Sequence, residues 1–310
     1  MGTLILIERL EVQNANAISS PLTIGVPSIT AFMGFAHQLQ RLVHQADPAS
    51  DLKVHRVGVI VHDIDLQVRH FPRSRSLLKL TANTRGGRNE SKKSERASFI
   101  EEGRCHLTVS LLLDCETEFQ GGATETLDRM QQLIMGRMRL AGGSIINTTP
   151  PNVQMVSNDR RTLTKLIPGW VLMERRDLMI DAMTEGLDAI DALHRALAIH
   201  HQRHLQFDSE TESETSSSPP TVSWTSGRYQ PGYIVPIATG YQALTPFIPS
   251  NNARDRDTPH RLAESALTLG EFVLPLRLNS PSEMLWQYHH DGDLYVCQQQ
   301  IFSSSDKSLS

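Results

Sequence analysis

Apolar and polar residues alternate along several stretches of this chain, a pattern typical of strands that bury one face. The alternation predicts strands over residues 4–12, 57–61, 64–68 and 107–113, and a short apolar run predicts another at 169–173. Apolar residues spaced by three and four predict one helix that opens at 27–28 and a second over 123–140. The resulting order, β-α-β-β-α-β, is the ferredoxin-like or RRM-like plan, so we expect an α+β fold.

Two details refine this pattern. The alternation changes parity at His62 and Asp63, which indicates a bulge or a break between two strands. The strand over 107–113 has an apolar face and a largely polar face, so we expect helices on the first face and an accessible second face.

The connection between the first strand and the first helix is long. It reads "QNANAISSPLTIGVP", residues 13–27, and is rich in small, polar and turn-forming residues. One interpretation is a surface loop stiffened by its two prolines. The other is a loop that presents amide and hydroxyl groups to a ligand.

Further elements are predicted beyond residue 176. A helical region over 177–204 precedes "DSETESETSSSPP", residues 208–220, which is acidic, serine-rich and nearly free of apolar residues. A cap at Thr258, a proline at 259 and apolar residues at 262, 266 and 269 predict a helix that ends at Gly270.

The 310 residues are enough for a sizeable core. We expect five parts. The first is an RRM-like core at 1–175, which includes a basic hairpin-like arm at 69–96. It is followed by a helical insertion at 176–207, a disordered acidic linker at 208–220, a C-terminal elaboration at 221–300 that packs on the core, and a disordered tail at 301–310.

The net charge of −4 gives no global indication of nucleic acid, but charge is unevenly distributed. The arm holds nine Lys or Arg against two Glu, a local charge of +7. Such an arm suits contact with phosphates, although a solvated, disordered charge run is the alternative.

The three cysteines form no CxxC pair, which argues against disulfides and a cysteine zinc site, and no targeting or membrane segment is evident. We expect a cytoplasmic protein.

Catalytic and metal-binding motifs are weak. The sequence has no GxSxG elbow, P-loop, GxGxxG, HExxH or kinase set, so we expect no enzyme, no cofactor and no metal. His200 and His204 have helical metal spacing but continue an apolar stripe, and "HDID" at 62–65 is better explained as a turn. "LWQYHH" at 285–290 suits core aromatics or base stacking. "NNARDRDTP" at 251–259 suits an elaborate helix cap or arginines braced to grip phosphate.

Several of these segments together resemble one family. They are "RLEVQNANAISSPLTIGVPSITAFMGFAHQLQR", "EEGRCHLTVSLLL", "MRLAGGSI", "LIPGWVLMERRDLM", "PGYIVPIATGYQALTPF", "NNARDRDTPHRLAESALTLGEFV" and "LWQYHH", in family order from residue 9 to about 290. The chain resembles the 5′-handle-binding subunit of the type I-F CRISPR surveillance complex, the Csy complex. This family belongs to the repeat-associated RNA-binding superfamily with an RRM-like fold.

The resemblance implies a non-catalytic subunit that binds the 5′ handle of the CRISPR RNA, pairs with the large subunit and abuts the first backbone subunit; contact with target double-stranded DNA is left open. Guide–target pairing would read the DNA sequence. The arm resembles the family's thumb-like insertion. The candidate RNA-binding residues are Gln13, Asn14, Asn16, Ser19, Ser20, Arg73, Arg75, Lys79, Arg85, Arg88, Arg137, Arg139, Gly142, Gly143, Ser144, Arg254 and Arg256.

Two other classes of function compete with this one. Relatives with the same fold cut RNA, so an endoribonuclease that matures CRISPR RNA is the alternative, with His106 or His289 as the general base. The third possibility is a protein scaffold whose arm is disordered.

Overall fold

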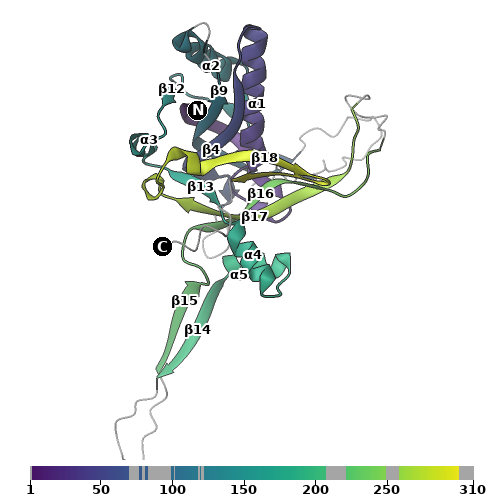
Figure 1. Cartoon of the computed structure of the whole chain (residues 1–310). Coiled ribbons are helices and arrows are strands. Elements are labelled where there is room, and N and C mark those ends of the chain that lie inside the picture. The colour runs from purple at the N-terminus through teal and green to yellow at the C-terminus, as the bar shows by residue number, and fades with distance from the viewer. Residues whose placement is uncertain are drawn as a thin grey trace, which may run out of the picture.

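The structure is a computed structural model that describes residues 2–69, 77–78, 81–82, 99–100, 102–117, 119, 122–206, 221–248 and 258–299. It confirms an α+β protein, in which a large antiparallel sheet carries a few helices (Figure 1). Within the described part of the chain, no helix has the length and apolar character needed to cross a membrane. The predicted linker at 208–220 and tail at 301–310 lie outside the described residues.

The strands at the centre of the sheet come from the first half of the chain. The sheet order runs β10-β11-β1-β9-β4-β13, and β12 also pairs with β1, antiparallel throughout. The bounds are β1 Thr3–Asn16, β4 Lys53–Leu66, β9 Arg104–Glu116, β10 Arg139–Leu140, β11 Gly143–Ile145, β12 Val153–Val156 and β13 Trp170–Glu174. The strand predicted at 169–173 is therefore present, but it pairs with β4, whereas β11 and β12 flank β1.

Two helices cover one face of these strands. Helix α1 (Ile29–Ala46) begins at Ser28, whose side chain accepts a hydrogen bond from the Thr30 amide, as its predicted start requires. Helix α2 spans Ala123–Arg137. Apolar residues of both helices pack with Ile5, Ile7 and the odd-numbered residues of β9 in the main core. The helices thus bury the face that alternation predicts to be apolar.

The predicted irregularity in the second strand is a bulge. Strand β4 is continuous, and its pairing with β9 shifts register between Val61 and Asp63. The chain then enters β5 (Val68–Arg69), and the basic arm at 69–96 lies almost entirely outside the described residues. The structure describes its short pieces β6 Leu77–Leu78, β7 Thr81–Ala82 and, beyond it, β8 Phe99–Ile100.

The second half of the chain extends the sheet into a closed circuit. The pairings run β4-β13-β17-β16-β19-β18 and return to β4, because β18 pairs with Val57 and Gly58 while β13 pairs with Ile60 and Val61. The bounds are β16 Ile234–Ala243, β17 Ala263–Val273, β18 Leu285–Asp291 and β19 Leu294–Gln299. Trp286 is fully buried in this circuit, and its indole Nε1 donates to the Leu172 carbonyl, so the core interpretation of this aromatic is confirmed.

The second face of the central strands is covered at one end, contrary to the expectation that it stays accessible. Leu6, Ile60 and Leu112 pack there against Leu163 and Met284. These partners come from helix α3 (Arg160–Lys165) and the short 3-10 helix Pro281–Met284, which follows another at Pro275–Arg277. Leu112 occupies a position of the polar parity in β9, so its apolar character marks this second core.

The helix predicted over 258–270 is wrong. Residues 263–273 form strand β17, which pairs with β16 on one side and β13 on the other. Leu262, Ala266 and Leu269 fit a helical spacing. Leu267 and Leu269, however, are two residues apart, as the apolar residues of a strand are, and both lie in β17. The long-range pairing with β16 decides between the two patterns.

The helical prediction over 177–204 is only partly correct. Helices α4 (Arg176–Thr184) and α5 (Ala189–Leu197) form a third core with Ile234 and Leu269. The chain then becomes strand β14 (Ile199–Gln206), which pairs with β15 (Thr221–Arg228) to form a ribbon that projects from the body (Figure 1). His200 and His204 are therefore in a strand, not a helix, which removes the helical i, i+4 geometry.

Candidate nucleic-acid interface

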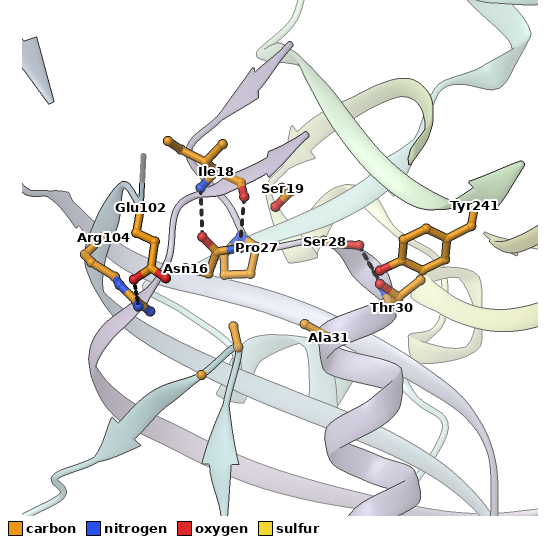
Figure 2. Close-up of a pocket in the computed structure, with 12 residues that line it drawn as sticks. Asn16, Ile18, Ser19, Pro27, Ser28, Thr30, Ala31, Glu102, Arg104 and Tyr241 are labelled. Carbon is orange, nitrogen blue, oxygen red and sulfur yellow. Dashed lines mark hydrogen bonds and ion pairs between the residues drawn. The ribbon is translucent and has the colours of Figure 1, made fainter. Parts of the chain in front are cut away.

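A groove of about 760 Å³ lies where β1 ends and α1 begins (Figure 2). The predicted long loop is shorter than expected here, because β1 continues to Asn16 and a small hairpin of β2 (Ile18–Ser20) and β3 (Thr23–Ile24) follows. The groove is lined by residues of β1, β2, α1, β9, the β10–β11 turn and β16: Asn16, Ile18, Ser19, Pro27, Ser28, Thr30, Ala31, Glu102, Arg104, Ala141, Gly142 and Tyr241. Three predicted residues, Asn16, Ser19 and Gly142, therefore meet in one place.

Asn16 shapes the entrance to the small hairpin. Its Nδ2 donates to the Ile18 carbonyl at 2.9 Å, and its Oδ1 accepts from the Ile18 amide at 3.2 Å (Figure 2). An Asn amide has a second N–H and a second acceptor position, so this arrangement orients the side chain and leaves further bonding capacity.

The two predicted serines differ in their environment. Ser19 lines the groove and donates a hydrogen bond to the Val26 carbonyl at 3.4 Å. Ser20 is only 6% exposed, and its hydroxyl bonds to Thr23 Oγ1 and accepts from the Leu22 amide. Ser20 thus holds the β2–β3 turn from inside.

Arg104 is a groove residue that the sequence interpretation missed. It is paired with Asn16 across β1 and β9, forms an ion pair with Glu102, and donates from Nη1 to the Asn14 carbonyl at 3.4 Å. A signal was present: Arg104 shares the polar parity of β9 with His106, Thr108 and Ser110. Its guanidinium has five N–H groups, so those two contacts leave donors for a ligand.

The turn between β10 and β11 places backbone at the rim of the groove. Ala141 and Gly142 both have positive φ, 48° and 76°, as the two central residues of a type I′ hairpin turn require. Gly143 packs so closely on β1 that a Cβ would lie 2.7 Å from Val12 Cγ1 and 2.8 Å from the Gln13 carbonyl oxygen. Gly143 is therefore buried, and Gly142 is the glycine that faces the groove.

Three other predicted residues form one row across the sheet. Ser144 is paired with Gln13 of β1 on one side and with Arg139 of β10 on the other. All three side chains are exposed. Directly paired residues point to the same face of an antiparallel sheet, so an arginine, a hydroxyl and an amide present themselves together. Arg137, the last residue of α2, is also exposed.

A polar cluster continues this surface beside Arg104. Asn14 has a positive φ of 59° in the bulge between Val12 and Ala15, and its Oδ1 accepts a hydrogen bond from Gln67. Gln67 also approaches His106 Nε2 at 3.5 Å. His289, the other candidate base, is exposed on β18. Among the described residues, no group of His, Cys, Asp or Glu is arranged to hold a metal ion.

Seven candidates lie outside the described residues, in the basic arm and in the "NARDR" segment: Arg73, Arg75, Lys79, Arg85, Arg88, Arg254 and Arg256. Their assignment stays a prediction.

A polar groove that is lined by partly exposed Arg104, together with exposed Arg139 on β10, is suited to binding an anionic, polar ligand. Comparison with known proteins gives the class. Residues 5–297 match the family described as CRISPR-associated protein (Cas_Csy2). The chain is also 36% identical to the CRISPR-associated protein Csy2 of Pseudomonas aeruginosa (strain UCBPP-PA14), over 313 residues that cover 94% of this chain and 92% of that protein. The chain belongs to the Cas_Csy2 family, and it is a subunit of the type I-F CRISPR complex, the Csy complex.

Proposed function

We propose that this subunit binds the 5′ handle of the CRISPR RNA in the groove at the end of β1, without cutting it. The observation that carries the proposal is the convergence of Asn16, Gly142 and Arg104 in one groove, beside the exposed row of Gln13, Ser144 and Arg139. Amide, hydroxyl and guanidinium groups suit single-stranded RNA, whose bases can be splayed out and whose phosphates need cations.

The arrangement of the central strands supports an RRM-like core. Strands β11 and β12, β1, β9 and β4 follow one another in the sheet, and the intervening helices α1 and α2 both contribute to the core on one face. This matches the order expected when a β-α-β-β-α-β chain folds into an antiparallel sheet.

The proposal includes the partners that the family resemblance implies. The subunit pairs with the large subunit and abuts the first backbone subunit, and the basic arm at 69–96 separates handle from spacer nucleotides. Arg254 and Arg256 add phosphate contacts. Guide–target pairing, rather than this chain, reads the sequence of the invading DNA.

Arg104 provides the sharpest test. Replacing it with Ala should weaken binding of a handle oligonucleotide in a gel-shift titration by about tenfold, as expected for loss of a charge-assisted contact. Arg161→Ala is the matched control, because Arg161 is exposed on α3 and is not among the groove residues. If wild type and Arg104→Ala bound the handle oligonucleotide with equal affinity, the groove would not be the binding site for the handle.

Incubation with labelled repeat RNA separates the proposal from the endoribonuclease alternative. We expect intact RNA after prolonged incubation with the purified chain. Among the described residues, His106 contacts only the Gln67 amide and His289 is exposed, and neither arrangement would activate a 2′-hydroxyl. Site-specific products that disappear in His106→Ala or His289→Ala would establish the alternative instead.

A further inference from the structure

The ribbon of β14 and β15 stands away from the three cores, and its two faces differ. It leaves the body after α5 and returns to it at Arg228 (Figure 1). The base is anchored, because Arg228 Nη1 donates to the Ile234 carbonyl at 2.9 Å and the Arg195 guanidinium lies 4.3 Å from the centre of the Tyr229 ring. Its function is not explained by the groove described above.

The register assigns each ribbon residue to a face. Ile199 is paired with Arg228, His201 with Ser226, and Arg203 with Trp224, and alternate residues share a face. The first face therefore carries Ile199, His201, Arg203, Val222, Trp224, Ser226 and Arg228. The second face carries uncharged polar side chains and glycine: Gln202, Ser223, Thr225 and Gly227, together with His200 and His204.

The first face has the composition of an interface centre. Ile199, Val222 and Trp224 are 57%, 48% and 63% exposed, and Trp224 lies directly opposite Arg203. Tryptophan and arginine are the residues most often found at the energetic centre of protein interfaces. A two-stranded ribbon is at best marginally stable in water, so a partner that covers this face would also stabilise the ribbon.

Charge distinguishes a protein partner from a nucleic acid. Strands β14 and β15 contain Arg203 and Arg228 and no Asp or Glu, which favours an anionic surface. The sequence that joins the two strands, 207–220, contains four carboxylates and no Lys or Arg, so the whole excursion is net acidic. A phosphate backbone would be repelled there, whereas a protein surface can meet both signs locally.

We propose that the first face of the β14–β15 ribbon docks another protein subunit of the same complex, through a partner surface with a pocket for Trp224 and a carboxylate that pairs with Arg203. The choice of a subunit of this complex rests on the proposed function, while the interface itself rests on the ribbon. Binding would bury the indole and leave the second, polar face in water.

The test is assembly of the complete complex. The full chain is co-expressed with the other subunits and a CRISPR RNA, as wild type, as Arg203→Gln with Trp224→Ala, and as a control that changes the opposite face, Gln202→Ala with Ser223→Ala. The proportion of each chain that co-elutes with the complex is measured, together with the affinity of the purified chain for each of the other purified protein subunits. We expect at least a tenfold loss of affinity for the first variant and none for the control.

Three further measurements make the outcome decisive. Circular dichroism and thermal unfolding of each free chain should be unchanged, and Trp224→Phe should restore most of the partner affinity because it keeps an aromatic side chain. Handle RNA binding by the free ribbon variant should equal that of wild type. Normal assembly of the variant would overturn the docking proposal, as would a selective loss of RNA or duplex DNA binding. Loss of assembly in a chain that never binds handle RNA would contradict the proposed function but support the ribbon interface.

Discussion

The imidazole Nε2 of His62 on β4 lies 2.7 Å from Ser110 Oγ on β9, while Nδ1 of the same ring contacts the Pro168 carbonyl. A carbonyl can only accept, so the proton is on Nδ1 and Nε2 accepts from the serine hydroxyl. Ser110 Oγ also accepts from the Arg9 amide at 2.9 Å. His62, at the β4 bulge, therefore connects β9 with the segment that precedes β13, and through Ser110 it also connects to β1.

Replacing His62 with Gln should destabilise the protein by about 1–3 kcal/mol, because the buried Ser110 hydroxyl and a strand connection lose their partner. Urea unfolding at pH 7.5 measures the change. His37→Gln, on the exposed side of α1, is the control and should stay within about 0.5 kcal/mol of wild type. Equal losses in the two variants would contradict the linking role of His62.

The stabilisation by His62 should depend on pH. Burial is the largest cause that lowers the pKa of His62, with repulsion from Arg9 added and the Pro168 hydrogen bond opposing both. A lowered folded-state pKa means that the unfolded chain binds the proton first, near pH 6.5. The stability difference between wild type and His62→Gln should therefore be complete above pH 6.5 and shrink as pH falls through the folded-state pKa. A difference that grew on acidification would show that the ring is charged in the folded protein.

Gly143 and Gly136 should respond in opposite directions to alanine. A Cβ at Gly143 would meet the backbone of Gln13 and Ala15 at 2.8 Å, so Gly143→Ala must displace β11 from β1. We expect a loss of about 1–3 kcal/mol in unfolding free energy, together with weaker handle binding because the row through Ser144 moves. Gly136 lies inside α2 with open space around it, and Gly136→Ala should stabilise the helix by up to about 1 kcal/mol. Similar losses at both glycines would contradict the packing argument.

Local sequence patterns were sufficient to predict the elements that bury one regular apolar face in the main core. Strands β1, β4 and β9 and helices α1 and α2 follow from alternation and from three- and four-residue spacing. Strand β17 does not, because Leu262, Ala266 and Leu269 fit a helical spacing while Leu267 and Leu269 fit a strand alternation, and only the pairing with β16 decides between the two patterns. Strand β14 was missed because its partner β15 begins after the serine-rich segment 208–220, and a short stretch of sequence contains no sign of a pairing over that distance.

The candidate site was partly predictable for the same reason. Gln13, Arg139 and Ser144 are candidates through the family resemblance, but their alignment in one row depends on the bulge between Val12 and Ala15 and on the β10–β11 turn. Arg104 was missed because a single arginine at a strand end has no sequence motif of its own. Its position opposite Asn16 requires the β1–β9 register.

The three cysteines should be unreactive in the folded chain. Burial raises the pKa of the Cys105 thiol to about 11 and those of Cys115 and Cys297 to about 12. The thiolate is the reactive species, so its fraction at pH 8 is very small and access is blocked. Ellman's reagent should detect no rapid thiol in the native protein and three thiols after denaturation. A fast native thiol would show that its strand opens on the time scale of the assay.

Arg139 should contribute a phosphate contact that is insensitive to base identity. Arg139→Ala should weaken binding of handle RNA and of an unrelated single strand of equal length by similar factors, because a guanidinium on phosphate carries no sequence information. It should also reduce the slope of log affinity against log salt by about 0.7, the value for one contact on a single strand. Fluorescence anisotropy at several salt concentrations measures both effects, with Arg41→Ala on the exposed side of α1 as the control. If the salt slope stayed constant while affinity fell for the handle alone, Arg139 would instead read a base edge, and the row with Ser144 and Gln13 would be the place where the handle's sequence is recognised.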